Sequence, residues 1–201
     1  MEQAKVDKAA EEQYNRDIGI SGDVDFMRMI KNYREKSIPE EQTHNISGNS
    51  KICICIRKRP ISQKEINRDD NDCVSCSNPL VIVHDCKLKV DGITKYLDNS
   101  SFEFDHTFHE DNNTDNIYDC AVQPLVEYVM NGGRATVFAY GQTGSGKTFT
   151  MQGIQSYVAD DLFALLEHYE KELGIQVQVQ VSYFEVSEGI FLSSYHTIPT
   201  C

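Results

Sequence analysis

The chain has 201 residues, of which 40% are hydrophobic, and 19 basic and 31 acidic residues give it a formal net charge of -12. This length and hydrophobic content suffice for one main core. The strong negative charge argues against broad, sequence-independent nucleic-acid binding, because such binding depends on lysine and arginine side chains that contact the phosphates. The sequence has no apolar run of membrane-spanning length and no signal peptide, so we expect a soluble, intracellular protein without a membrane partner.

The cysteines suggest free thiols rather than disulfides. The chain has 7 cysteines, an odd number, and together with the missing signal peptide this indicates a reducing compartment. Cys73 and Cys76 form a CxxC pair, and His84 and Cys86 follow it, so four zinc ligands are available in principle. Their spacing matches no common zinc module. We therefore favour ordinary half-buried thiols beside a strand over a metal site.

Residues 1–50 differ in composition from the rest of the chain and are predicted to form an N-terminal extension of the main domain. They are rich in charged and polar residues, and helix-breaking segments follow residue 37. One amphipathic helix is expected near residues 24–36, capped by Asp23. Its apolar residues at helical spacing are Phe26, Met29, Ile30 and Tyr33. Such a helix serves either to cover the core or to bind a partner.

The main domain is expected to begin at residue 51 and to extend to residue 201. Residues 52–56 form an apolar run that predicts a strand covered on both faces. Residues 80–84 predict a second strand, residues 89–92 a turn, and residues 102–104 an alternating strand. These three segments together favour an antiparallel hairpin.

Helices and strands alternate in the second half of the chain. Apolar positions over residues 117–130 predict a helix that Pro124 kinks or shortens and that Gly132-Gly133 ends. A buried strand is expected at residues 135–140, because the run Ala-Thr-Val-Phe-Ala-Tyr is apolar and β-branched. Three further elements are predicted along the chain: a helix at 147–152, a second helix at 158–173, and a strand over 177–186.

A glycine-rich segment between the predicted strand and helix matches the phosphate-loop pattern G-x-x-x-x-G-K-[ST]. Its residues are Gly141, Gln142, Thr143, Gly144, Ser145, Gly146, Lys147 and Thr148. Glycines let backbone N–H groups wrap around phosphates, and the helix start adds the positive end of its dipole. Lys147 is expected to reach the β and γ phosphates, and Thr148 to ligate Mg2+. A plain Gly-Ser turn with an exposed lysine is the much weaker alternative.

The residues around this loop are more specific than the loop itself. Residues 140–151 spell the segment Tyr-Gly-Gln-Thr-Gly-Ser-Gly-Lys-Thr-Phe-Thr-Met, which resembles the phosphate loop of kinesin motor domains. The segment at 57–60 is similar to the kinesin segment that lies under the adenine, those at 104–108 and 182–186 are similar to kinesin strands, and all three fall in the family's order. The resemblance covers roughly residues 24–187. It implies an α/β fold of the P-loop NTPase type, ATP with Mg2+ as ligands, and microtubules as partner in the cytoplasm.

The resemblance also implies roles for individual residues. Four side chains are expected to frame the adenine by stacking and cation–π contact: Arg57, Arg59, Pro60 and Phe149. Phe149 stands where kinesins commonly have histidine. The segment at 26–34 is similar to the neck of the kinesin-13 group, whose members depolymerise microtubule ends. In that group a tripeptide at a hairpin tip contacts tubulin, which implies the same task for Lys89, Val90 and Asp91.

Two features depart from the family and leave alternatives open. The loop that normally interrupts the helix after the phosphate loop is nearly absent between residues 151 and 158. The sequence also lacks the Ser-Ser-Arg and Asp-x-x-Gly segments that sense the γ phosphate, so we expect nucleotide binding with little hydrolysis. A non-catalytic tubulin-binding chain is the first alternative. A different P-loop NTPase is the second, and it requires an aspartate-bearing strand that we do not find.

Overall fold

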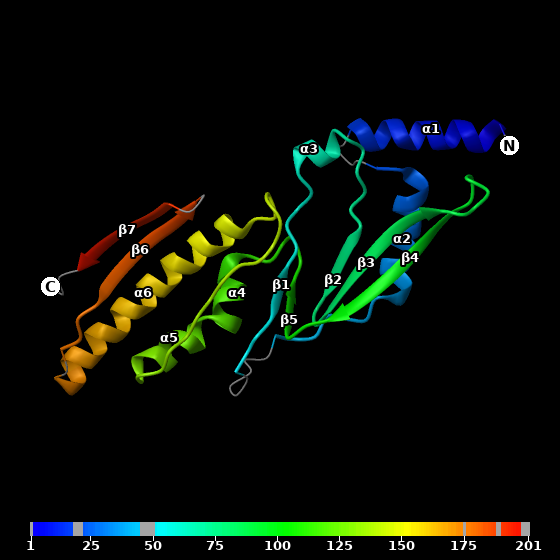
Figure 1. Cartoon of the computed structure of the whole chain (residues 1–201). Coiled ribbons are helices and arrows are strands. Elements are labelled where there is room, and N and C mark those ends of the chain that lie inside the picture. The colour runs from blue at the N-terminus through cyan, green and yellow to red at the C-terminus, as the bar shows by residue number, and fades with distance from the viewer. Residues whose placement is uncertain (1, 18–21, 45–50, 175, 188–189, 198–201) are drawn as a thin grey trace. The chain divides into compact units, whose positions relative to one another are not determined.

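The computed structural model describes the whole chain except residues 1, 18–21, 45–50, 175, 188–189 and 198–201 (Figure 1). The chain forms two compact units, Met1–Ile154 and Gln155–Cys201. The first unit contains the helix expected in residues 1–50 together with strands β1 to β5, which follow it in the chain. Among the described helices, none has the length and apolar character needed to cross a bilayer.

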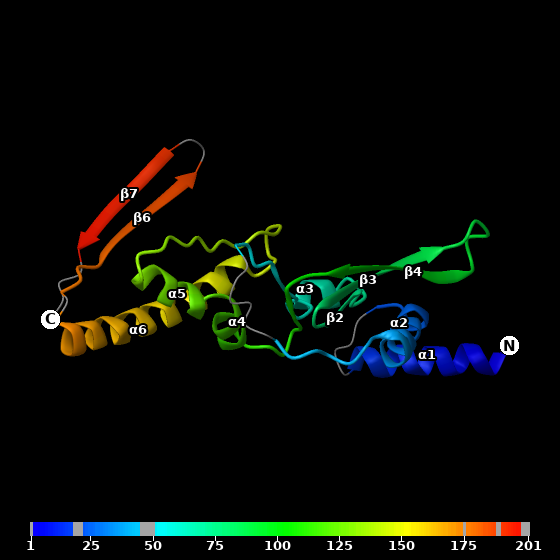
Figure 2. The same cartoon turned by 90° about the horizontal axis from the view of Figure 1, so that it is seen from below.

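The largest sheet of the first unit is antiparallel and has the strand order β2-β3-β4. These strands are β2 (Val74–Ser77), β3 (Leu80–Leu88) and β4 (Lys95–Glu103). In the register of β3 and β4, Val81 lies opposite Phe102 and Leu88 opposite Lys95. Figure 2 shows that β3 and β4 continue as a two-stranded ribbon beyond the short β2. The predicted hairpin is therefore confirmed, with longer strands than the sequence indicated.

A second, parallel pair is formed by β1 (Cys55–Arg57) and β5 (His106–Phe108). All three residues of β5 are buried. The prediction of a strand over residues 52–56 with both faces covered is wrong for its first half, because Ile52 and Ile54 are exposed and precede β1. In the described part of the chain β1 pairs with β5 alone, so its other edge has no neighbour to extend the ladder.

Two helices precede these strands: α1 (Glu2–Asp17) and α2 (Val24–Ser37). The Asp23 carboxylate accepts hydrogen bonds from the backbone N–H groups of Asp25 and Phe26, at 2.9 and 3.3 Å, and so caps α2 as predicted. The apolar face of α2 is buried, and the helix packs against β4. Of the two roles considered for this helix, covering the core is thus confirmed.

Polar contacts fix α2 to the sheet. The Arg34 guanidinium donates to Ser75 Oγ at 2.7 Å and to the backbone oxygens of Asp72 and Val74 at 3.0 Å each. It also pairs with the Asp72 carboxylate at 3.1 Å, which in turn accepts from Lys58 Nζ at 2.8 Å. Burial alone would raise the pKa of Asp72, but hydrogen bonding to Lys58 and the nearby positive charges hold it below its ordinary value.

One buried histidine under α2 gives the fold a pH dependence. His84 is 0% exposed, and its Nε2 and Nδ1 lie 2.8 Å from Ser75 Oγ and 2.6 Å from Asn99 Oδ1. Burial lowers its pKa, and the positive charges of Arg34 and Lys58 act in the same direction. Below pH about 6.5 this histidine therefore binds a proton more readily in the unfolded chain than in the folded chain.

We expect the free energy of unfolding to fall as the pH drops below about 6.5, with a slope of up to about 1.4 kcal/mol per pH unit from this histidine. Urea unfolding between pH 5 and 7.5, followed by circular dichroism, measures the slope. His84→Gln should make the slope smaller, whatever it does to the stability at neutral pH. An unchanged slope in that variant would contradict this assignment. Burial also lowers the pKa of His44, so part of the slope should remain.

Three short helices complete the first unit: α3 (Gln63–Ile66), α4 (Thr114–Ala121) and α5 (Gln123–Met130). Pro124 lies in the first turn of α5, and Val122 separates α5 from α4. The predicted helix over 117–130 is thus divided just before Pro124, because proline lacks the N–H group of a helix interior but fits the first turn. Asn131 caps α5 and Gly132 follows it with a φ of +85°, as predicted.

The run at residues 135–140 is not the buried strand that we predicted. Residues 135–140 do not form a strand, and the side chains of Phe138 and Tyr140 are 80% and 96% exposed. A strand is stable only when its backbone groups pair with a neighbour, and none of the described strands pairs with this segment. An apolar, β-branched run is therefore not sufficient for a strand.

Helix α6 (Lys147–Leu173) begins in the first unit and is continuous, whereas two helices were predicted over this range. Gly153 lies between the predicted segments, but a single glycine costs a helix only about 1 kcal/mol and no proline follows it, so the helix continues through residues 153–157. In the second unit, β6 (Gln180–Ser187) and β7 (Ile190–Thr197) form an antiparallel hairpin. The strand predicted over 177–186 therefore begins at Gln180, and β7 was not predicted.

Candidate functional site

The phosphate-loop segment connects residues 135–140 to α6. Gly144 and Gly146 have φ values of +82° and +96°, a region that disfavours other L-residues. The N–H group of Ser145 donates to the carbonyl oxygen of Gln142 at 3.1 Å and closes a turn. The first helical hydrogen bond of α6 runs from Thr150 N–H to Gly146 O, at 3.1 Å. The backbone N–H groups of residues 147–149 precede it and therefore have no partner within the helix. These N–H groups are the donors that phosphate oxygens need.

Lys147, the first residue of α6, folds back over the loop. Its Nζ donates to the backbone carbonyl oxygens of Gly141 and Gln142 at 2.8 and 2.9 Å. A phosphate group in the loop would offer this ammonium group charged oxygens, which accept stronger hydrogen bonds than neutral carbonyls. The lysine predicted from the motif thus lies beside the loop backbone.

The side chains suit a magnesium ion carried by the nucleotide better than a metal held by the protein alone. Thr148 is exposed in the first turn of α6, where its hydroxyl can supply one oxygen ligand. Among the residues that the structure describes, no group of three or more histidine, cysteine, aspartate or glutamate side chains is arranged to hold a metal. Mg2+ commonly takes its remaining ligands from phosphates and water.

Arg57 and Phe149, two residues predicted to frame the adenine, lie together. The Arg57 guanidinium carbon is 5.1 Å from the centre of the Phe149 ring, which is within cation–π distance. Phe149 is 68% exposed, so its ring remains available to stack against a base. Burial lowers the pKa of Arg57, which nevertheless stays charged at neutral pH.

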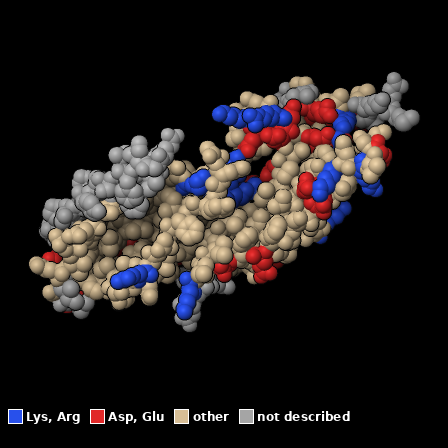
Figure 3. Space-filling model, in the orientation of Figure 1, with Lys and Arg blue, Asp and Glu red and all other residues tan. Residues whose placement is uncertain are grey.

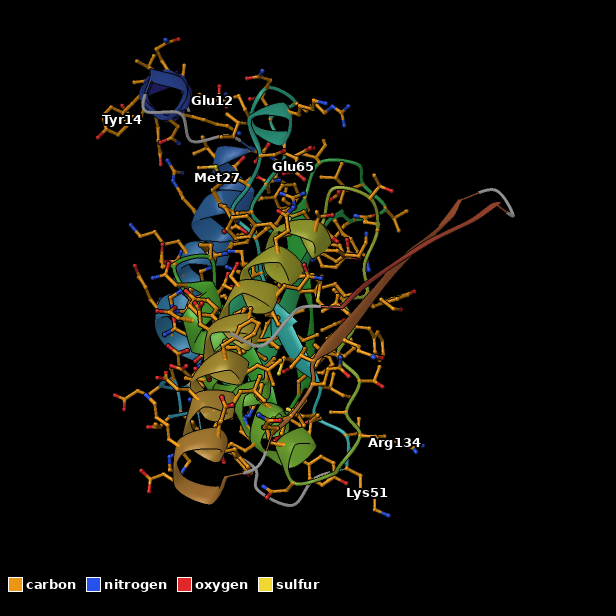
Figure 4. The ribbon with its side chains drawn as sticks, turned by 90° about the vertical axis from the view of Figure 1, so that its left-hand side faces the viewer. Glu12, Tyr14, Met27, Lys51, Glu65 and Arg134 are labelled. Carbon is orange, nitrogen blue, oxygen red and sulfur yellow. The ribbon has the colours of Figure 1, made fainter. Side chains whose placement is uncertain are left out.

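The other two residues of that prediction, Arg59 and Pro60, are placed differently. Arg59 forms two hydrogen bonds with the carboxylate of Glu65, at 2.8 and 2.6 Å, and one with Pro60 O at 2.9 Å. Glu65 lies on α3, where Figure 4 labels it. These contacts hold the pKa of Glu65 below its ordinary value. The guanidinium of Arg59 is thus already engaged by protein acceptors, and its role toward a base remains a prediction.

Sequence reasoning missed the residues that hold Arg57. Its Nη1 donates to the hydroxyls of Thr114 on α4 and Thr150 on α6, at 3.0 Å each, and Nη2 lies 3.4 Å from Asn112 O. Thr114 and Asn112 belong to no motif, and their distance from Arg57 in the sequence leaves no local signal. Thr150 entered the sequence analysis only as part of the kinesin-like segment at 140–151, and no contact with Arg57 was predicted for it.

The three residues predicted to contact tubulin form the exposed tip of the β3–β4 ribbon. Lys89 and Val90 are exposed, and the Asp91 carboxylate accepts hydrogen bonds from Ile93 N and Thr94 N at 2.9 and 2.8 Å. These bonds, with one from the Thr94 hydroxyl, lower the pKa of Asp91. The turn predicted at 89–92 is confirmed, and its conformation is fixed by Asp91.

Among the residues that the structure describes, the cysteines and His84 are not arranged as a metal site. The sulfur atoms of Cys73 and Cys86 lie 3.8 Å apart, while His84 faces Ser75 and Asn99. Burial raises the pKa of the Cys73 thiol and that of Cys76, the latter to about 11, which disfavours the thiolate form that binds zinc. On the right-hand part of the face seen in Figure 3, several acidic side chains lie beside basic ones.

Comparison with known proteins agrees with the phosphate-loop geometry. The family model described as "Kinesin motor domain" matches residues 57–191, more than half of the chain. The diatom spindle kinesin-1 of Cylindrotheca fusiformis is 45% identical over 207 residues, and the match covers 100% of this chain but 32% of that relative. The chain thus spans about a third of the relative's length. With its α/β elements and its phosphate loop at the start of α6, the chain belongs to the kinesin motor-domain family.

Proposed function

We propose that this chain is the nucleotide-binding part of a microtubule-based motor protein and that it binds ATP with Mg2+. The observation that carries the proposal is the loop at the start of α6, where Lys147 lies over carbonyl oxygens at 2.8 and 2.9 Å beside helix N–H groups that have no intrahelical partner. Membership of the kinesin motor-domain family supports the same ligand.

Each part of the site has a distinct task in this proposal. The loop amides and Lys147 bind the β and γ phosphates, and Thr148 contributes a ligand to Mg2+. The bound Mg2+ would neutralise phosphate charge. The exposed ring of Phe149 stacks against the base, and this contact is tolerant of base identity because stacking involves no hydrogen bond to the base edge.

Calorimetric titration of the chain tests this proposal. We expect saturable binding of Mg-ATP and at least tenfold weaker binding of AMP, because AMP lacks the β and γ phosphates that the loop amides and Lys147 bind. Chelation of Mg2+ should also weaken ATP binding. Equal affinities for Mg-ATP and AMP would contradict a phosphate-loop site.

We also propose that the chain contacts tubulin through the tip of the β3–β4 ribbon, and that it belongs to the kinesin-13 group. Three observations support this: the ribbon extends beyond β2, the side chain of Val90 is fully exposed, and Asp91 fixes the turn. The neck-like segment lies in α2, which packs beside the ribbon on β4. Microtubule association in the cytoplasm, and depolymerisation of filament ends, follow as parts of this proposal.

Co-sedimentation with microtubules and with free tubulin tests whether the tip of the β3–β4 ribbon contacts tubulin. The double variant Lys89→Ala, Val90→Ala should bind at least about fivefold more weakly, because it removes the positive charge and the exposed apolar side chain that the tip offers to a partner. Lys64→Ala, which removes an exposed lysine from α3, is the matched control and should bind normally. Unchanged binding by the double variant would contradict the proposal that the tip contacts tubulin. Binding that persists in Lys147→Ala would favour the non-catalytic alternative.

A further inference from the structure

Arg57 connects three segments that meet beside the phosphate loop. It is the last residue of β1, and a single nitrogen, Nη1, lies 3.0 Å from both Thr114 Oγ1 and Thr150 Oγ1. Thr114 is the first residue of α4, and Thr150 lies in the first turns of α6, three residues after Lys147. An Nη atom of arginine carries two hydrogens, so both hydroxyls can accept at once.

The start of α4 and the start of α6 also approach each other closely. A Cβ atom added at Gly153 would lie 2.8 Å from Thr114 Cγ2, which is closer than carbon atoms pack. The absence of a side chain at Gly153 therefore permits the contact that Arg57 bridges with hydrogen bonds. The position of the first turns of α6, and with it the direction of their free N–H groups, depends on this contact.

The hydrogen-bonding groups of Arg57 are directed at the protein rather than at open space. In addition to the two threonines, Nη2 faces the carbonyl oxygen of Asn112 at 3.4 Å. The guanidinium lies over the Phe149 ring at 5.1 Å and so restrains the ring that follows the phosphate loop. The hydrogen bonds use the edge of the planar guanidinium and the Phe149 ring lies against one face, so these contacts do not conflict with stacking of a base on the other face.

We propose that Arg57 is a positioning residue for the phosphate loop: by bridging Thr114 and Thr150 it holds the start of α6 where the loop amides meet the phosphates. This inference rests on the proposed nucleotide binding and concerns how the same site is organised. Arg57 then acts on the phosphate part of the ligand, through α6, in addition to the stacking on the base that the family resemblance implies. A ligand without a base must therefore also bind more weakly when Arg57 is lost.

Inorganic tripolyphosphate, which has the phosphate chain of ATP and no base, distinguishes the two roles. We measure the dissociation constants of Mg-ATP and Mg-tripolyphosphate for the wild-type chain and for Arg57→Ala. Loss of the two charge-assisted hydrogen bonds that join β1 to the starts of α4 and α6 should weaken the binding of both ligands by about tenfold or more. Weakening of ATP alone would overturn the proposal, because it would place Arg57 on the base only.

Thr114→Val is the more selective variant, since it removes the hydroxyl and keeps the Cγ2 that packs against Gly153. It should weaken both ligands by a few-fold, and combining it with Arg57→Ala should add little to the effect of Arg57→Ala alone. Arg134→Ala, which removes an exposed arginine and the same charge, is the control and should bind both ligands normally.

Circular dichroism and the melting temperature of each variant show that binding is measured on folded protein. A merely structural role would lower the melting temperature and leave both dissociation constants unchanged, and that result would overturn the positioning role while keeping the nucleotide site. If the wild-type chain bound neither Mg-ATP nor Mg-tripolyphosphate, both the nucleotide site and the role of Arg57 would be wrong.

Discussion

Replacing Lys147 with alanine is expected to weaken Mg-ATP binding by about 100-fold or more. The ammonium group now donates two hydrogen bonds, to Gly141 O and Gln142 O, and it would donate to the charged oxygens of the β and γ phosphates in their place. Hydrogen bonds to charged groups contribute about 1.5–3 kcal/mol each, and every 1.4 kcal/mol is about tenfold in affinity. Two such bonds therefore account for the expected loss, which titration calorimetry measures directly.

The same substitution should have little effect on stability. The two carbonyl oxygens that lose their donor lie in a surface loop, because Gln142 is exposed and Gly141 is half-buried, so water can replace the ammonium group. Lys171→Ala is the matched control: Lys171 is an exposed lysine on the same helix, paired with Glu167, and its loss should leave nucleotide affinity unchanged. Similar affinities of the wild type and Lys147→Ala for Mg-ATP would show that the phosphate loop does not bind the nucleotide as proposed.

Local chemistry explains which parts of the fold the sequence could predict. Asp23 satisfies N–H groups only two and three residues away, and Pro124 acts on the helix turn that contains it, so both signals are complete within a short segment. The hairpin turn is equally local, because Asp91 bonds to Ile93 and Thr94. The phosphate loop belongs to this class too, since its glycines and Lys147 are adjacent in the chain.

Predictions that required distant partners were incomplete or wrong. The runs at 52–54 and 135–140 have strand-like composition, yet a strand also needs a ladder of hydrogen bonds to a neighbouring strand. None of the described strands pairs with residues 135–140, and residues 52–54 lie outside the β1–β5 ladder although Ile54 O accepts from His106 N at 3.4 Å. The contacts of Arg57 with Thr114 and Thr150 join residues 57 and 93 positions apart. Composition carries no record of such pairings, so the organisation of the site around Arg57 could be found only in the structure.

The packing of β5 leads to the largest expected effect on stability. Phe108 is 0% exposed, lies at the end of the β1–β5 pair opposite Arg57, and stacks on the His44 ring with 4.5 Å between centroids. Phe108→Ala would leave a cavity that the surrounding strands cannot close, and such changes cost about 3–5 kcal/mol. Since domains are stable by about 5–15 kcal/mol, the variant should unfold at a much lower urea concentration.

A second phenylalanine provides the comparison that makes this result specific. Phe138 is 80% exposed, and Phe138→Ala should change the free energy of unfolding by no more than about 0.5 kcal/mol. Because the chain has two compact units, the measurement needs a probe of the first unit, such as protection of the β5 amides against hydrogen exchange. Losses of equal size in both variants would show that Phe108 is not the centre of a packed core. A loss confined to Phe108→Ala would show that β1, β5 and the segment carrying His44 are stabilised together, and that Arg57 is held by a rigid strand.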